Sequence, residues 1–228
     1  MDVHAHPAHK VDIENIMCVF MHVMLFFCLE YVKIMRIKGI HIGEDIMSEK
    51  FAVIDTETNW KNEVMSIGIV IAEDKKFSAI DTKYMIISEA ARVGGMFSKA
   101  LYIDGQRVEH GRRPNVIKAL IKYLKKNDVG SIFAYNANFD YRHLPELRHF
   151  NWHDIMRKAA YREYNPALPG NAVFCSTGRL KSGYSVESML HIFGEKNYCE
   201  VHNALEDAMD ELRIMKYLDY SVKMYSKL

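Results

Sequence analysis

Cysteine is scarce in this sequence of 228 residues and has no arrangement typical of a disulfide or a zinc site. The four cysteines are Cys18, Cys28, Cys175 and Cys199, and no two of them form a C-x-x-C pair. Neither a disulfide scaffold nor a structural zinc is therefore expected. Cys199 lies three residues before His202 and could be half of a metal site, but a thiol in a reducing, cytoplasmic environment is the favoured interpretation.

An excess of one charge sign is also missing. The chain has 30 Lys and Arg against 29 Asp and Glu, which gives a formal net charge of +1. No general basic field therefore points to a protein that coats long nucleic-acid duplexes. The hydrophobic share of 49% and the charged share of 26% are ordinary for a folded globular protein.

A long hydrophobic run is the third absence. Residues 16–29 form an apolar run of 14 residues interrupted by His22, whereas a membrane-spanning helix needs about 20. The run has neither a basic flank nor a small-residue cleavage site, so a signal peptide is not expected. We predict that residues 1–46 are an N-terminal extension and that 47–228 are the working domain. A mis-assigned start before Met47 is favoured, and a peripheral helix and a membrane anchor are the alternatives.

Hydrophobic periodicity after position 47 predicts a meander of strands followed by alternating helices and strands. Antiparallel strands are expected at 51–55, 64–72 and 78–88, and a parallel strand at 131–135. Helices are expected from Pro114 and at 140–150, 154–161, 185–193 and 204–218. The pattern is α/β and matches a ribonuclease H-like fold, in which helices flank a mixed five-stranded sheet.

Three acidic motifs occur in the order IDTET (54–58), NANFD (136–140) and HNALED (202–207). They supply four carboxylates and one imidazole, from Asp55, Glu57, Asp140, Asp207 and His202. Four carboxylates can share a site at neutral pH only if cations hold them, because like charges raise each other's pKa. Mg²⁺ and Mn²⁺ prefer such oxygen ligands. The set is typical of metal-assisted phosphodiester hydrolysis.

The expected local structure brings these side chains together. Asp55 and Glu57 are two residues apart, so a strand places both on the same face. Asp140 follows a strand at a turn into a helix, at the sheet end where open α/β sheets usually bind ligands. His202 lies just before the last helix and Asp207 lies inside it. Taken singly, these acids could also be solvated strand ends or helix caps.

Together, the three motifs resemble the DEDDh family of 3′-5′ exonucleases, which includes the proofreading subunit of bacterial DNA polymerase III, RNase T and oligoribonuclease. The resemblance covers about residues 47–228 and implies the same ribonuclease H-like fold. Relatives of the tyrosine type have Tyr four residues before the last acid, where this chain has Asn203. The resemblance therefore favours the histidine subtype.

The resemblance also implies a mechanism with two divalent ions, Mg²⁺ or Mn²⁺, about 3.5–4 Å apart. Asp55, Glu57 and Asp207 would hold the first ion. Asp55 would bridge to the second, with support from Asp140. His202 would act as the general base toward the attacking water, since its ordinary pKa is near 6.5.

Substrate contacts are expected from residues within and just after the first two motifs: Thr56, Thr58, Trp60, Asn136 and Phe139. Many relatives continue the first motif as Thr-Thr-Gly, where this chain has Thr58-Asn59-Trp60. Trp60 could stack on a base or pack in the core. Phe139 has the same two alternatives.

Three functions are compatible with these features. The leading prediction is a 3′-5′ exonuclease that acts on single-stranded DNA or RNA ends. The second is a binding or proofreading module in a polymerase or repair complex, and the third is a hydrolase of short oligonucleotides or dinucleotides. A membrane partner is not expected, and the sequence does not indicate an oligomeric state.

Overall fold

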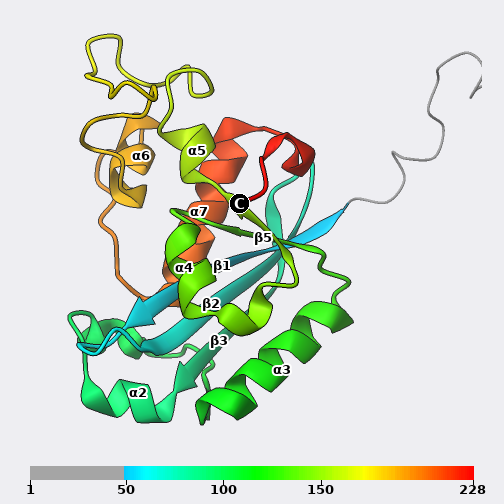
Figure 1. The fold of residues 1–228 in the computed structure, drawn as a ribbon. Coiled ribbons are helices and arrows are strands. Elements are labelled where there is room, and N and C mark those ends of the chain that lie inside the picture. Colours follow the sequence, from blue (N-terminus) through cyan, green and yellow to red (C-terminus); the bar gives the residue numbers. More distant parts are fainter. Residues whose placement is uncertain (1–48) are drawn as a thin grey trace, which may run out of the picture. The chain divides into compact units, whose positions relative to one another are not determined.

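The computed structural model describes residues 49–228, and the expected N-terminal extension of residues 1–46 lies outside this part of the chain. Within it, six strands form one mixed sheet in the order β4-β3-β2-β1-β5-β6 (Figure 1). The strands are β1 Lys50–Thr58, β2 Val64–Glu73, β3 Ser78–Ile87, β4 Glu109–Gly111, β5 Ser131–Ala134 and β6 Asn151–Asp154.

The strand pairing confirms the predicted meander. β1, β2 and β3 are antiparallel neighbours, and β5 runs parallel to β1. The short strand β4 runs parallel to β3, and the short strand β6 runs parallel to β5. Neither short strand was predicted from the sequence. With them the sheet has six strands rather than the five expected. Strands of three and four residues are too short to show a hydrophobic alternation.

The helices are α2 Ser88–Val93, α3 Arg113–Lys126, α4 Asn138–His143, α5 Met156–Ala159, α6 Val186–Ile192 and α7 Ala204–Leu218, with 3₁₀ turns at Ser98–Leu101 (η1), Pro145–Leu147 (η2) and Val222–Met224 (η3). The helix predicted at 140–150 is broken into α4 and η2. Leu144 precedes Pro145, whose ring disfavours the helical conformation there, and it has φ −119° and ψ 60°. The helix predicted at 154–161 is shorter, because Asp154 belongs to β6.

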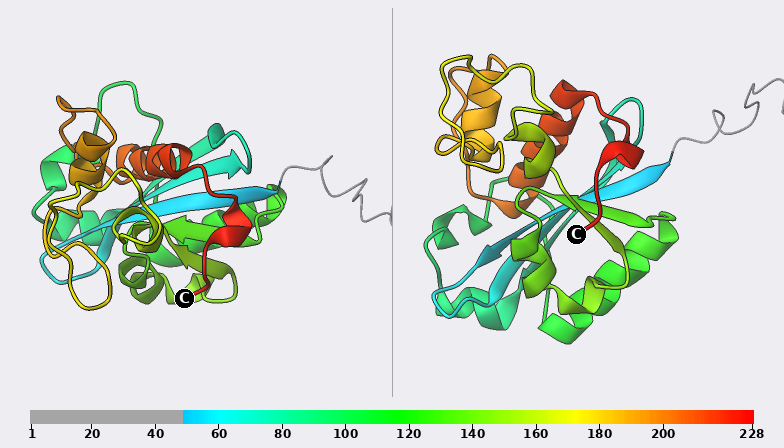
Figure 2. Two further views of the ribbon diagram at one scale, coloured as in Figure 1. Left: turned by 90° about the horizontal axis from the view of Figure 1, so that it is seen from above. Right: turned by 45° about the horizontal axis from the view of Figure 1, so that its top comes forward.

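Helices cover both faces of the sheet, with α7 on one side and α3 on the other (Figure 2). Alternate residues of β1 point to opposite faces. Phe51 and Val53 pack in the same core as Leu212 of α7, whereas Ala52 and Ile54 pack in the core that includes α3. Continuing this alternation, Asp55 and Glu57 face α7. The strand period therefore directs two of the motif acids to the helix that carries a third.

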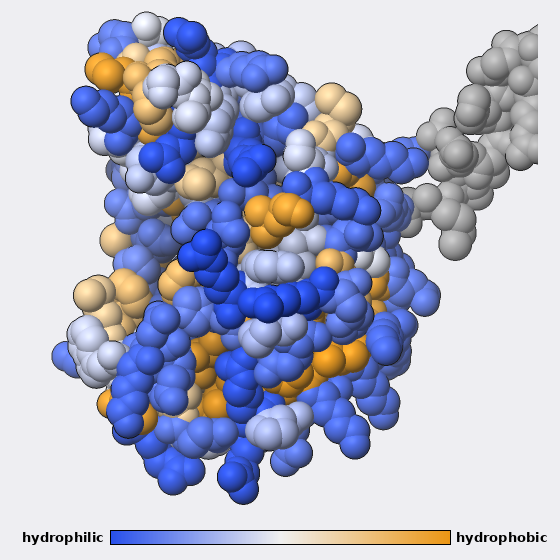
Figure 3. Space-filling view, viewed as in Figure 1, coloured by the Kyte–Doolittle hydropathy of each residue, from blue (hydrophilic) through white to orange (hydrophobic). Residues whose placement is uncertain are grey.

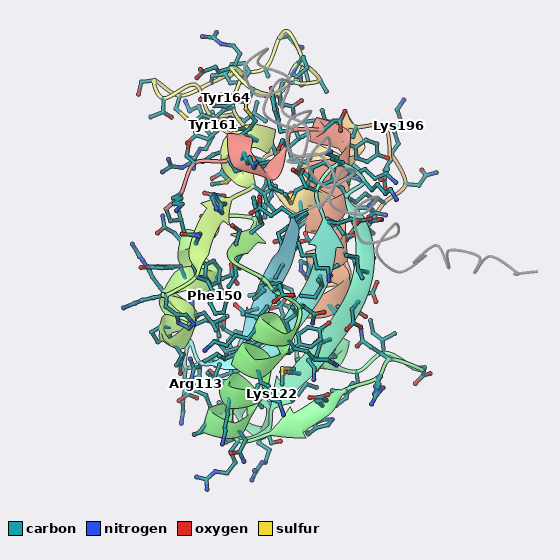
Figure 4. The ribbon with its side chains drawn as sticks, turned by 90° about the vertical axis from the view of Figure 1, so that its right-hand side faces the viewer. Arg113, Lys122, Phe150, Tyr161, Tyr164 and Lys196 are labelled. Atoms are coloured by element: carbon teal, nitrogen blue, oxygen red, sulfur yellow. The ribbon has the colours of Figure 1, made fainter. Side chains whose placement is uncertain are left out.

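Helix α3 has an exposed basic side. Val116 and Leu120 are buried against the sheet, and Lys118 and Lys122 are exposed. Figure 4, in which Lys122 is labelled, shows the helix in front of the sheet. None of the helices within residues 49–228 has the length and apolar character needed to cross a membrane.

Candidate active site

The end of β1 carries the first two acids. Asp55 is opposite Gly68 of β2, and the register shifts between Glu57 and Thr58, where the strand pairing ends. Figure 1 shows this end of β1 beside α4 and the start of α7. Glu57 is 8% exposed, so its carboxyl group is largely removed from water.

Gly68 lets α7 come close to the sheet at this point. A Cβ atom on Gly68 would overlap the carbonyl group of Ala204 and the backbone nitrogen of Leu205 in the first turn of the helix. A glycine inside a strand marks such a close backbone approach. This residue was not among the predicted site residues, although its position in an apolar strand was a readable signal.

Helix α7 and the residues before it supply Asp207 and His202. Glu57, His202 and Asp207 each present a ligand atom, and these atoms lie within 4.8 Å of one another. Asp207 is 5% exposed, and its Oδ1 atom has no hydrogen-bond partner among the described residues. A buried carboxylate oxygen without a partner is rare unless it serves a ligand. These three residues can therefore hold a cation.

Asp140 reaches the same region from α4. Its Oδ1 atom accepts a hydrogen bond of 2.7 Å from the Thr56 hydroxyl, and the residue is 2% exposed. It is not one of the three residues whose ligand atoms gather within 4.8 Å. Its charge nevertheless raises the pKa of Asp55 and of Glu57. Asp140 thus stands at the edge of the cluster, fixed by Thr56.

Burial, together with repulsion from neighbouring acids, raises the pKa values of the four acids. Burial, followed by the charge of Asp207, raises the pKa of Glu57 to about 8. Burial also raises the pKa of Asp140 and of Asp207 to about 7, and that of Asp55 well above its ordinary value. Ionising such a group costs free energy that a bound cation would offset. The electrostatics therefore favour binding of positive charge.

Two further acids stand beside the predicted ones. Glu211 follows Asp207 by one helical turn, is 2% exposed, and its Oε2 atom has no hydrogen-bond partner in the part of the chain described. Burial and then Asp55 raise its pKa well above the usual range. Glu200, two residues before His202, also has a raised pKa from burial. The spacing of four residues from Asp207 could have signalled Glu211, because such residues share one helix face.

The predicted substrate residues fall into two groups, one buried or partly buried and the other exposed. Thr56 is 5% exposed and donates to Asp140, and Thr58 is partly buried at the strand end. Trp60 is 69% exposed, so it is not a core residue. Asn136 is exposed with φ 59°, and Phe139 is 37% exposed beside the ring of His143.

Asn136 and Phe139 line a hollow of about 1080 Å³, whose lining includes none of the four motif acids. Val64, Ile87 and Ala90 give this hollow an apolar floor. Figure 3 shows apolar atoms exposed between α2 and α3, with hydrophilic surface around them. An apolar floor with a few polar groups is typical of a small-molecule or nucleotide pocket.

Charged side chains stand at the edge of the same hollow. The cations are Arg113 and Arg142, and the acids are Glu63, Glu89 and Glu146. Arg113 forms an ion pair with Glu146, with 3.0 Å between the nitrogen and oxygen atoms. The rim therefore carries both charge signs.

Comparison with known proteins finds likeness in structure and not in sequence. No protein-family model matches the sequence, and no curated protein matches it. One similar solved structure concerns the 3′-end specific recognition of a histone mRNA stem-loop by a 3′-exonuclease. It is 14% identical to this chain at a TM-score of 0.55, and the match covers 91% of this chain and 80% of that one. The nuclease domain of 3′hExo, a DEDDh family member bound to rAMP, is 16% identical at a TM-score of 0.51, over 75% of this chain and 92% of that one. A full-length 3′-exonuclease is 17% identical at a TM-score of 0.52, over 74% of this chain and 80% of that one.

The structure is an α/β domain with a ribonuclease H-like fold, and a buried acidic cluster lies at the carboxyl end of its central strand. Within that class, the chain shares its fold with DEDDh-family 3′-exonucleases. At identities between 14% and 17%, the likeness establishes the fold, which agrees with the prediction from the three motifs.

Proposed function

We propose that the chain is a metal-dependent 3′-5′ exonuclease of the DEDDh family that shortens single-stranded DNA or RNA from the 3′ end and releases 5′-mononucleotides. The observation that carries this proposal is the convergence of Glu57, His202 and Asp207, whose ligand atoms lie within 4.8 Å of one another. The likeness in fold to solved 3′-exonucleases supports it.

The donor set suits Mg²⁺ or Mn²⁺. It consists of carboxylate oxygens and one imidazole, and Asp207 offers an oxygen with no protein partner among the described residues. Asp55, Glu57 and Asp207 would hold one ion, and Asp55 with Asp140 a second. Bound there, the ions would stabilise negative charge on the phosphate and on the leaving 3′-oxygen.

The protein's own residues bring about the proton transfer. His202 accepts a proton from water as the water oxygen bonds to phosphorus and the bond from phosphorus to the 3′-oxygen breaks. The 3′-oxygen leaves with the shortened strand and takes a proton from solvent. A general base of this kind contributes about 10²–10⁴-fold to the rate. Thr56 keeps Asp140 in place through its hydrogen bond of 2.7 Å.

The terminal nucleotide would lie in the hollow that Asn136 and Phe139 line. Phe139 offers a ring, Asn136 offers a side-chain amide, and the apolar floor accepts a base. Thr58, at the end of β1, borders the acids. Trp60 is exposed on the turn after β1 and is available to stack on a further base.

The test uses the full chain with matched 3′-labelled single-stranded DNA and RNA and with Mg²⁺ or Mn²⁺. Stepwise loss of mononucleotides that is abolished in Asp55→Asn and His202→Asn supports the proposal and ranks the two substrates. Glu206→Gln is the matched control, because this exposed acid is the neighbour of Asp207 on α7. Equal activity in wild type and in both site variants would identify a contaminating nuclease and refute the assignment.

A second candidate, a hydrolase of dinucleotides or very short oligonucleotides, is favoured by the charge around the hollow. Glu63, Glu89 and Glu146 stand on its rim beside the two arginines, and acidic groups repel a long polyanion. Rates on a dinucleotide and on a 20-mer of the same sequence separate the two candidates. A kcat/KM that is at least about tenfold higher on the dinucleotide would favour the short substrate.

A further inference from the structure

An aromatic ring lies directly against His202. The ring of Phe97 stacks on the imidazole with 3.9 Å between the centroids and 22° between the planes. Both residues are partly buried. Phe97 belongs to residues 94–101, which connect α2 to the end of η1 and are called the cover segment here. This segment carries none of the motif residues, so nothing in the proposed mechanism accounts for the contact.

The cover segment is fastened to β1 at its first end. Gly94 accepts a hydrogen bond of 3.0 Å from the backbone nitrogen of Trp60, just after the strand. A Cβ on Gly95 would lie 2.5 Å from the carbonyl oxygen of Thr58, so the backbone runs against the strand end. Ser98 then closes the turn with a hydrogen bond of 3.0 Å to the Gly95 carbonyl.

The second end of the cover segment is fastened beside His202 itself. The side-chain nitrogen of Asn203 donates a hydrogen bond of 2.7 Å to the carbonyl oxygen of Ala100. Asn203 is fully buried, and its side-chain oxygen caps α7 by accepting from Leu205 and Glu206. The segment is thus held between the strand that carries Glu57 and the helix that carries Asp207.

Stacking on Phe97 restrains the plane of the His202 ring. Its backbone has φ 59°, in the left-handed region that a residue with a side chain seldom adopts. Within residues 49–228 the structure shows no hydrogen bond to either nitrogen of the imidazole. A catalytic histidine is usually oriented by a hydrogen bond to its second nitrogen. Here the stacked ring of Phe97 takes that place.

We propose that Phe97 is a positioning residue, which fixes the plane of the His202 imidazole so that one ring nitrogen faces the oxygens of Glu57 and Asp207. This inference rests on the proposed role of His202 as general base. A misplaced catalytic group costs about 10²-fold in rate. Loss of the ring should therefore lower kcat while the substrate still binds.

The kinetic test compares Phe97→Leu and Phe97→Tyr with wild type. Phe97→Leu should lower kcat about 10–100-fold with KM changed less than about threefold, and Phe97→Tyr, which keeps a ring, should restore most of the rate. In a His202→Ala background, Phe97→Leu should have no further effect. Met96→Ala is the matched control, because Met96 is the neighbour of Phe97 and is 70% exposed. A Phe97→Leu effect on KM that persists without His202 would overturn the proposal and make Phe97 a substrate contact.

A second readout needs no activity. The ring current of Phe97 should shift the carbon-bound proton resonances of the His202 imidazole upfield in wild type, and this shift should disappear in Phe97→Leu. The resonances are assigned by their absence in His202→Ala. Unchanged His202 resonances in Phe97→Leu would overturn the stacking. An inactive wild type that shows the shift would refute the exonuclease and leave the packing of Phe97 on His202 established.

Discussion

Helix α7 carries two sets of buried acids that differ in what they contact. Asp210 is 7% exposed and accepts hydrogen bonds from the Tyr198 hydroxyl and from the Arg213 guanidinium, the latter at 2.5 Å. Asp207 and Glu211 are 5% and 2% exposed, and each keeps one carboxylate oxygen with no partner in the described part of the chain. The carboxylate of Asp210 therefore has its hydrogen bonds satisfied, whereas Asp207 and Glu211, called the unsatisfied set here, each have an oxygen that does not.

The difference separates a compensated acid from two acids that each keep an uncompensated oxygen. Burying a carboxylate is tolerable when hydrogen bonds and a cation compensate it, as Tyr198 and Arg213 do for Asp210. Through Tyr198, Asp210 also ties the chain just before His202 to α7. Among the described residues, one oxygen of Asp207 and one of Glu211 lack such compensation, which fits a site completed by metal ions. Perturbed acids that lack protein partners are typical of functional sites.

Exchanging one acid of each set for its amide gives the largest expected contrast. Asp207→Asn should lower kcat/KM by about 10³-fold or more, since a metal ligand is lost, and should leave stability unchanged or slightly higher. Asp210→Asn should keep activity within about tenfold and destabilise by about 1–3 kcal/mol, because Arg213 loses one of its two charged partners and keeps only Glu195. Activity assays and denaturant unfolding measure both. Similar losses of activity in the two variants would erase the distinction.

Gly68→Ala tests whether the unsatisfied set depends on the close approach of α7 to the sheet. The added Cβ would overlap the backbone of Ala204, so the start of the helix must shift away from β2. We expect about 10²-fold lower kcat/KM, because Asp207 moves relative to Glu57, and a loss of about 1–3 kcal/mol in stability. Asp210 lies one turn further along, where Arg213 still reaches it. Ala72→Gly, elsewhere on β2, is a control with comparable backbone change, and full activity in Gly68→Ala would contradict the geometric argument.

The pH dependence of metal-free stability reports the same uncompensated acids. Burial raises the pKa of Glu57 to about 8 and that of Asp207 to about 7, above their values in an unfolded chain. The folded state therefore binds these protons more tightly, and stability falls as the pH rises from about 4 toward 8. Mg²⁺ or Mn²⁺ should raise Tm by several degrees at pH 8 and by much less at pH 5.5, since metal must displace protons. Thermal unfolding with and without metal measures this, and a metal effect that is independent of pH would contradict it.

Much of this architecture could be read from the sequence because it depends on local periodicity. The apolar run of residues 51–55 predicted a strand, and the spacing of Asp55 and Glu57 placed both acids on one face of it. The period of residues 204–218 predicted α7. The parts that escaped depend on contacts between distant segments. Pairing with β5 is what makes a strand of Asn151–Asp154.

The site shows the same limit. The motif acids could be named because their spacing is local. Phe97 stands in a segment without clear period, and only the folded chain brings its ring to His202. The role of Thr56 was likewise hidden, since its partner Asp140 is 84 residues away. Sequence patterns thus identified the acids but not the side chains that hold them.

Substitution of Glu211 has the smallest expected effect on activity. It tests the comparison between the satisfied and the unsatisfied acids of α7 most closely. Its side chain accepts a hydrogen bond from the backbone of Tyr135, and Asp55 and Asp140 help to raise its pKa after burial. Because the folded state holds this proton more tightly than the unfolded chain, its contribution to stability is lost as the pH rises. Glu211→Gln keeps the acceptor and removes the charge. We expect about 1–2 kcal/mol more stability than wild type at pH 8, no difference at pH 4, and activity within about threefold. If the variant instead loses activity about 100-fold and its Tm no longer responds to Mn²⁺, then Glu211 is a metal ligand and the metal site has one more ligand than the three motifs predict.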